Sequence, residues 1–132
     1  MLPLPSSHNH TMPPEYSPRD PKLWGGFYWN MFFNYASYYP KNPTHQQKLN
    51  AKRYYSYFLD KLPCYTCTLS FQRFWKELPI DNYLASRESL IFWVYALKNK
   101  VNAKLRSEGQ HKRDASFNEV LNYVNTKRYY RF

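Results

Sequence analysis

Cysteine, glycine and acidic residues are all scarce in this chain of 132 residues. The three glycines, two of them adjacent at Gly25-Gly26, form no glycine-rich loop for binding phosphate. The nine Asp and Glu residues are scattered, so no paired-carboxylate site or Ser/His/Asp triad is evident. No apolar run is long enough to span a bilayer. Because residues 1–5 lack the basic and apolar regions of a secretory signal, we expect an intracellular protein.

The two cysteines stand three positions apart, in the segment Pro63-Cys64-Tyr65-Thr66-Cys67. A disulfide that stabilises a fold more usually joins distant segments, because closing a long loop constrains the unfolded chain more. In an intracellular protein, a CxxC segment is more often catalytic or metal-binding than structural. The segment after Pro63 has the pattern of a helix start, where the helix dipole lowers the pKa of a thiol. The sequence therefore predicts a redox centre at Cys64 and Cys67.

A zinc site is the alternative use of a CxxC segment, and the histidines argue against it. None has a ligand-like spacing to either cysteine, so we expect no metal. The four histidines are His8, His10, His45 and His111.

Positive charge and aromatic rings are abundant. Lys and Arg number 19, the net charge is +10, and 20% of the residues are aromatic. This charge favours an anionic partner, which leaves nucleic acid, an acidic protein and a phosphorylated cofactor open. So many aromatic rings exceed the needs of a small core, and some should line a flat ligand or an interface. The basic positions of the C-terminal third are Lys98, Lys100, Lys104, Arg106, Lys112, Arg113, Lys127, Arg128 and Arg131.

The chain divides into three parts by composition. Residues 1–21 carry six of the ten prolines and have little to bury, so we expect a disordered arm. Residues 22–126 form the expected domain, and a basic aromatic tail covers residues 127–132. Helical periodicity dominates the domain and strand-like alternation is absent. We therefore predict an all-α fold, a four-helix bundle with a short fifth helix.

Local signals place the ends of these helices. The first helix runs from about residue 24 and ends at Pro40, and Thr44 can cap a second that ends at Pro63. The third begins at the CxxC segment and stops before Pro79, and the fourth ends near Gly109. The apolar stripes are Trp24, Phe27, Tyr28, Met31, Phe32, Tyr35 and Ala36; Ala51, Tyr55, Phe58 and Leu62; Cys67, Phe71, Phe74 and Leu78; Leu90, Val94, Leu97, Val101 and Leu105; and Phe117, Val120, Leu121 and Val124.

Three segments carry a resemblance to a known family. They are WGGFYW at residues 24–29, continuing to YYP at 38–40, the CxxC segment after Pro63, and WVYALKNKVNAKL at 93–105. Their order and spacing resemble the Erv/ALR family of FAD-dependent sulfhydryl oxidases, over about residues 23–106. The compact form, without additional cysteines, looks most like the members encoded by large DNA viruses.

The resemblance implies a helical bundle that holds FAD between its helices, with the CxxC segment against the isoalloxazine ring. By position, Trp29 would pack on the flavin nucleotide, and Asn99, Asn102 and Lys104 would contact it from the fourth helix. The two asparagines are three positions apart and share a helix face. Lys98 or Lys104 can balance the charge of the pyrophosphate.

Two positions depart from the family pattern. Phe33 stands four residues after Trp29, where the family usually has histidine, and Lys98 replaces the usual histidine before Asn99. These replacements bear on cofactor binding, because both histidines generally lie at the cofactor. Phe33 can still stack on an adenine, and Lys98 can still meet a phosphate.

The resemblance further implies thiol oxidase activity. A reduced substrate protein would attack the disulfide at Cys64, and Cys67 would lie nearest the flavin. Electrons would pass through FAD to oxygen and give hydrogen peroxide. The shuttle cysteines of the family are missing, so the substrate would be a separate dithiol protein, thioredoxin-like or a virion protein.

The setting and the assembly follow from the same resemblance. If the chain is viral, we expect it in the host cytoplasm or the virion. We also expect a homodimer joined without disulfides, because both cysteines belong to the redox centre. The alternative function is a non-enzymatic basic helical binding protein for nucleic acid or an acidic protein, with nucleic acid the less favoured partner.

Overall fold

Helices make up the regular structure of the part of the chain that the computed structural model describes, which is the backbone of residues 21–126 and the side chains of 25–126. No strand occurs there, so the all-α prediction is confirmed. The arm expected over 1–21 lies outside these residues except for Pro21, the first residue of the first helix, and so does the tail expected over 127–132. The elements are α1 (Pro21–Ser37), α2 (His45–Ser56), the 3₁₀ segment η2 (Tyr57–Asp60), α3 (Tyr65–Glu77), the 3₁₀ segment η3 (Ile80–Tyr83), α4 (Arg87–Ser107) and α5 (Phe117–Thr126).

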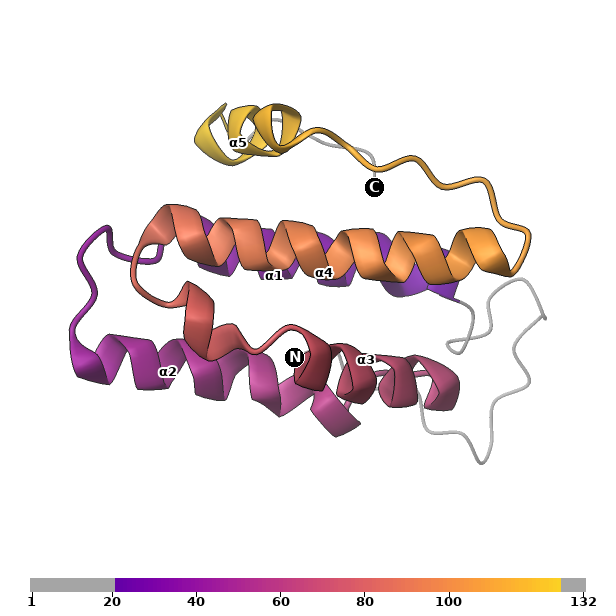
Figure 1. Cartoon of the computed structure of the whole chain (residues 1–132), viewed down its shortest axis with the longest axis horizontal. Helices are drawn as coiled ribbons and strands as arrows, with labels where there is room; N and C mark the ends of the chain where they lie inside the picture. Colours follow the sequence, from indigo (N-terminus) through magenta and orange to yellow (C-terminus); the bar gives the residue numbers. More distant parts are fainter. Residues whose placement is uncertain (1–20, 127–132) are drawn as a thin grey trace.

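The helices lie in three tiers (Figure 1). The long helices α1 and α4 pack against each other and form the middle tier. Helices α2 and α3 follow one another on one side, joined by η2, and α5 lies on the other side against both α1 and α4. The hydroxyl of Tyr123 in α5 donates a hydrogen bond to Asn30 Oδ1 in α1 at 2.6 Å. None of the helices within residues 21–126 combines the length and apolar content needed to cross a bilayer.

The helix boundaries follow from local hydrogen bonds. Thr44 caps α2 as expected: its hydroxyl accepts from the Gln47 N–H at 3.1 Å, and the Gln47 side chain accepts from the Thr44 N–H at 2.8 Å. Gly109 adopts a φ of 88°, a conformation that costs glycine little. Its N–H and that of Gln110 bond back to carbonyls of the last turn of α4, at 3.0 Å each. The expected end of the fourth helix near Gly109 is therefore confirmed.

The second helix differs from its predicted length. We expected one helix as far as Pro63, whereas α2 ends at Ser56 and the chain continues as η2. The tighter 3₁₀ turn leaves carbonyls without α-helical partners, and the Gln72 side chain of α3 donates to one of them, the Leu59 carbonyl, at 3.0 Å. Phe58 remains buried in the shorter arrangement. The change of helix type thus fastens the end of this segment to α3.

Aromatic residues dominate the core, and three of those that carry a polar atom are Tyr39, Tyr55 and Trp93. Each of these three donates a hydrogen bond to a backbone carbonyl in another part of the fold, which satisfies the buried donor. The bonds run from Tyr39 Oη to the Leu84 carbonyl at 2.7 Å, from Tyr55 Oη to the Phe32 carbonyl at 2.7 Å, and from Trp93 Nε1 to the Leu78 carbonyl at 2.9 Å.

Replacement of Tyr55 by phenylalanine should destabilise the fold by about 0.5–1.5 kcal/mol, because it removes one buried hydrogen bond and keeps the ring. Tyr57→Phe is the matched control, since that side chain is 47% exposed. Urea unfolding of both variants measures the difference. Equal stability of the two variants would show that the buried hydroxyl contributes nothing to the fold.

Candidate active site

The CxxC segment forms the start of α3, as the sequence indicated. Cys64 is the N-cap residue, with φ −139° and ψ 123°, and the Cys67 N–H donates to its sulfur at 3.3 Å. The thiol thus caps the helix by accepting a backbone hydrogen bond, as a serine hydroxyl does at other helix starts. Both cysteines are half-buried free thiols. The helix start therefore places the two sulfurs at one end of α3 and orients backbone donors toward Cys64.

Hydrogen bonds favour the ionised form of Cys64. Burial raises the pKa of this thiol, but donors on Cys67 and Thr66, from side chain and backbone alike, outweigh burial and lower the pKa below its usual value. The Thr66 hydroxyl oxygen lies 3.2 Å from the Cys64 sulfur. Cys64 is therefore the thiol of the pair that ionises first.

The environment of Cys67 disfavours the ionised form of its thiol. Burial, the hydrogen bond to Cys64 and the negative charge of the Cys64 thiolate together raise the pKa of Cys67 to about 12. The positive charge of Lys104 and the Thr66 hydroxyl act in the other direction. Lys104 belongs to α4, where its ammonium group also pairs with Glu108 Oε2 at 2.8 Å.

A second group of predicted residues joins α1 to α4. Lys98 Nζ lies 5.4 Å from the ring centre of the half-buried Trp29, over its face. Burial and, to a smaller extent, the charge of Lys112 lower the pKa of Lys98 to about 8, although Asp114 opposes both. Lys98 keeps a hydrogen bond of 3.4 Å to Asn102 Oδ1. An indole face and an ammonium group thus lie together between the two central helices.

The two asparagines of α4 play different parts. Asn102 is only 3% exposed, and its amide donates to Asp114 Oδ1 at 3.1 Å and to the Arg113 carbonyl at 3.5 Å. It therefore attaches α4 to the segment that leads into α5. The side chain of Asn99 is half-buried and makes no hydrogen bond within the described residues. A cofactor contact by Asn102 requires its bond to Asp114 to open, whereas Asn99 needs no such change.

Phe33 occupies the core rather than a ligand surface. Its exposed fraction is 0%, so the stacking on an adenine that we expected requires the side chain to leave the core. The remaining positions present a stacking surface in Trp29, ammonium groups in Lys98 and Lys104, and an amide in Asn99. Such a set suits a flat, anionic ligand. The residues that could hold a dinucleotide are therefore four of the predicted ones, while Phe33 is buried in the core.

Two residues that matter here were not predicted as site residues. Thr66 lies between the cysteines, and the residue type itself was a signal, since a hydroxyl there can reach either sulfur. Asp114, the partner of Asn102, follows a helix end in a segment without periodicity and left no such signal. No group of three or more His, Cys, Asp or Glu side chains is placed to hold a metal ion among residues 25–126.

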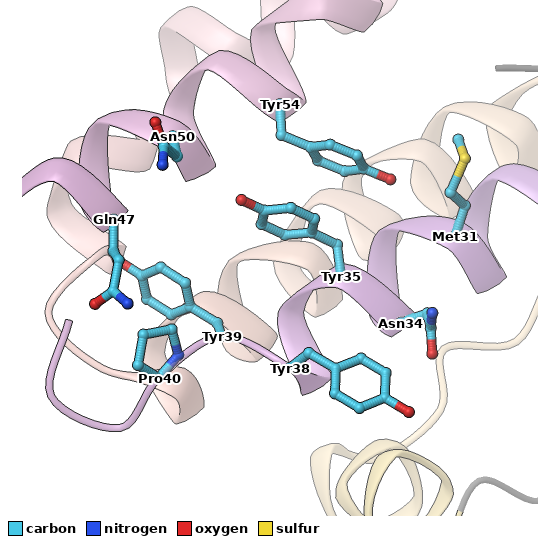
Figure 2. Close-up of a pocket in the computed structure, with 9 residues that line it drawn as sticks. All are labelled: Met31, Asn34, Tyr35, Tyr38, Tyr39, Pro40, Gln47, Asn50 and Tyr54. Atoms are coloured by element: carbon cyan, nitrogen blue, oxygen red, sulfur yellow. The ribbon is translucent and has the colours of Figure 1, made fainter. Parts of the chain in front are cut away.

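A separate pocket lies between α1 and α2 (Figure 2). Its volume is about 360 Å³, and the rings of Tyr35 and Tyr54 stack beside it with centroids 3.9 Å apart. Burial and the neighbouring Tyr35 raise the pKa of Tyr54 to about 12. None of the predicted site residues lines this pocket. The lining residues are Met31, Asn34, Tyr35, Tyr38, Tyr39, Pro40, Gln47, Asn50 and Tyr54.

Two unequal thiols at a helix start, set in a helical bundle, can carry out dithiol–disulfide exchange. The profile of the Erv1 / Alr family matches residues 27–126, and the chain belongs to this family. The resemblance drawn from the three sequence segments is therefore confirmed.

Named relatives include viral proteins. The chain is 36% identical over 86 residues to a probable FAD-linked sulfhydryl oxidase of Acanthamoeba polyphaga mimivirus, covering 62% of this chain and 58% of the relative. It is 35% identical over 89 residues to the mitochondrial FAD-linked sulfhydryl oxidase ERV1 of Saccharomyces cerevisiae, covering 67% and 46%. The chain thus spans about half the length of these relatives.

Solved structures support the same assignment. The FAD-binding domain of Erv1 from Saccharomyces cerevisiae superposes with a TM-score of 0.72 at 30% identity, over 81% of this chain and 95% of that one. The yeast Erv1 core superposes with a TM-score of 0.68 at 28% identity, over 94% and 93%. The described helices therefore have the arrangement of the Erv1 core.

In the reduced protein, alkylation of Cys64 should precede alkylation of Cys67 as pH rises, because Cys64 ionises first and the pKa of Cys67 is raised to about 12. Mass spectrometry of the peptide after iodoacetamide treatment across a pH series gives both midpoints. In Cys64→Ala, the midpoint of Cys67 should fall, because the neighbouring thiolate is gone. Faster labelling of Cys67 in the unmodified protein would contradict the assignment.

Proposed function

We propose that this chain is an FAD-linked thiol oxidase, which forms disulfides in substrate proteins and passes the electrons through FAD to oxygen to give hydrogen peroxide. The observation that carries the proposal is the pair of unequal thiols at the start of α3, within the family match over residues 27–126. Relatives named FAD-linked sulfhydryl oxidases support it.

The reaction begins at Cys64. A substrate thiolate attacks the sulfur of Cys64 in the Cys64–Cys67 disulfide, the bond between the cysteines breaks, and Cys67 leaves with the bonding electron pair. Attack at Cys64 is supported by burial, because Cys64 is the less buried of the two thiols. The product is a mixed disulfide between the substrate and Cys64.

Formation of the mixed disulfide changes the state of Cys67. While Cys64 is a thiolate, its charge and hydrogen bond help to raise the pKa of Cys67. Once Cys64 is bonded to the substrate, both causes disappear and only burial still raises the pKa of Cys67. The charge of Lys104 remains and favours the Cys67 thiolate. Lys104 thus stabilises the leaving thiolate at the point in the cycle where that thiolate is needed.

The cofactor region lies between α1, α4 and the start of α3. Trp29, Lys98, Asn99 and Lys104 are the residues that we propose to hold FAD, and Asn102 positions Lys98 by accepting its hydrogen bond of 3.4 Å. The fit is supported by the indole face, the free amide and the two ammonium groups already described. Bound FAD would supply the two-electron acceptor that returns the cysteines to the disulfide and the route to oxygen. Lys98 stays cationic at neutral pH, since its lowered pKa of about 8 still exceeds that value.

The substrate is a second protein that carries a dithiol, thioredoxin-like or a virion protein, because these 132 residues hold no third cysteine to relay electrons. A dithiol that exchanges with Cys64 must approach the start of α3, where Tyr65 is 77% exposed.

The viral relatives support a setting in the cytoplasm of an infected cell or in the virion. Mass spectrometry of purified virions and of the cytosol of infected cells, with the cytosol of uninfected cells as control, tests that setting.

The purified protein should contain FAD, released on denaturation and measured by chromatography.

Cys64→Ser and Cys67→Ser should each abolish oxygen consumption with a dithiol substrate while FAD stays bound, because the electron relay needs both sulfurs. Thr68→Ser, in the same helix, is the control that should keep both properties. A colourless, folded protein that shifts nucleic acid in a gel would instead favour the non-enzymatic basic binding protein.

The chain should form a homodimer that survives reductant, since both cysteines belong to the redox centre and none is left for an interchain bridge. Exposed apolar and aromatic side chains supply surface for such an interface. They are Phe27, Tyr38, Leu49, Tyr57, Tyr65, Leu69 and Phe92. Light scattering at tens of micromolar, with and without dithiothreitol, measures the mass. A monomer under both conditions would refute the dimer.

A further inference from the structure

The hydroxyl of Thr66 lies within the redox centre, and neither the family match nor the proposed mechanism gives it a part. Its oxygen is 3.2 Å from the Cys64 sulfur. Thr66 is the second residue of α3, its side chain is exposed, and helix capping does not occupy it, because Cys64 itself caps the helix. Every hydrogen bond of this hydroxyl within the described residues goes to the cysteine pair.

We propose that Thr66 is a further residue of the reaction centre, whose hydroxyl donates a hydrogen bond to the Cys64 sulfur and stabilises the thiolate that departs when the oxidised substrate is released. This inference rests on the proposed function. A threonine hydroxyl can rotate toward the sulfur while the sulfur gains charge, whereas the Cys67 N–H, at 3.3 Å, is fixed by the helix.

The step that Thr66 assists is the second exchange. The second thiolate of the substrate attacks the substrate sulfur in the mixed disulfide, and a disulfide forms within the substrate. The bond between that sulfur and Cys64 breaks, and Cys64 leaves with the electron pair as a thiolate. The substrate loses two electrons, the cysteine pair gains them, and the two thiol protons pass to solvent. A leaving thiol of lower pKa departs faster, so a donor to Cys64 accelerates this step.

The same hydrogen bond affects the equilibrium of the pair. A donor that stabilises the reduced form makes a disulfide more oxidising. The pKa of Cys64, which hydrogen bonds from Thr66 and Cys67 lower, is consistent with that direction. The other ionisable groups that act on the pair are Cys67 itself and Lys104 of α4. Both residues stay in place when Thr66 is replaced, and the Cys67→Ala background removes the bond from Thr66 to Cys67, so that the bond to Cys64 can be tested alone.

The test compares Thr66→Val, which keeps the shape and removes the hydroxyl, with Thr66→Ser, which keeps the hydroxyl. Thr68→Val removes a hydroxyl two positions further along α3 and serves as the matched control. The full-length protein is equilibrated with reduced and oxidised glutathione, and the fraction of oxidised pair is counted by alkylation and mass spectrometry. In a Cys67→Ala background, the pH profile of Cys64 alkylation is measured for the same three variants.

Thr66→Val should make the pair less oxidising by about three- to tenfold in the equilibrium constant, the size expected for one hydrogen bond. It should also move the alkylation midpoint of Cys64 to higher pH. Thr66→Ser should restore both values, and Thr68→Val should leave both unchanged. If Thr66→Val does not fold, Thr66→Ala replaces it with the same expectation.

Unchanged equilibrium and alkylation in Thr66→Val would overturn the proposal. Equal changes in Thr66→Val and Thr68→Val, together with lower melting temperatures, would also overturn it, since that result shows a structural effect on α3. Neither measurement depends on bound FAD or oxygen consumption. A failure of the proposed oxidase function would appear in the flavin content and would leave these thiol measurements interpretable.

Discussion

The need to satisfy the polar atoms of large buried aromatic side chains organises this fold. Trp93 of α4 donates to the carbonyl at the end of α3, Tyr55 of α2 donates to α1, and Tyr39 after α1 donates to the residue that follows η3. Each ring contributes apolar area, but its polar atom restricts where the ring can lie. Side chains of the core therefore hold the connections between helices. Because one of these bonds holds the end of α3, it also restricts where the start of α3 can lie.

The fold was predictable from sequence where the signals are local. Thr44 and Gly109 marked helix ends correctly, because capping and positive φ depend on a few neighbouring residues. The 3₁₀ segment η2 was missed, because the apolar spacing of Phe58 and Leu62 suits a continuing helix. The Gln72 side chain of α3 donates a hydrogen bond to a carbonyl of η2 and so stabilises the 3₁₀ turn. The apolar periodicity within one helix carries no information about a partner on another helix.

In the candidate site, too, the features that depend on neighbouring residues were predictable, and those that depend on distant contacts were not. The cap formed by Cys64 was predictable from the CxxC segment, because the residues that create it are adjacent. The bond from Asn102 to Asp114 crosses a helix end and a loop, and it required the folded arrangement to be seen. The complete burial of Phe33 is likewise a property of the folded chain that its place in the motif did not indicate. The chemistry of a position thus depends on which side of the helix the core occupies.

The hydrogen bond between Tyr123 and Asn30 bears on how the chain is made. Its two residues are 93 positions apart, so α1 can complete this contact only after nearly the whole domain has been synthesised. Contacts of such long separation form late, because the intervening loop must first be closed at a cost in entropy. During translation, Asn30 and its neighbours in α1 therefore emerge long before α5 arrives to pack beside them. A ribosome that stops before α5 would release α1 with that face uncovered, in a state open to chaperones.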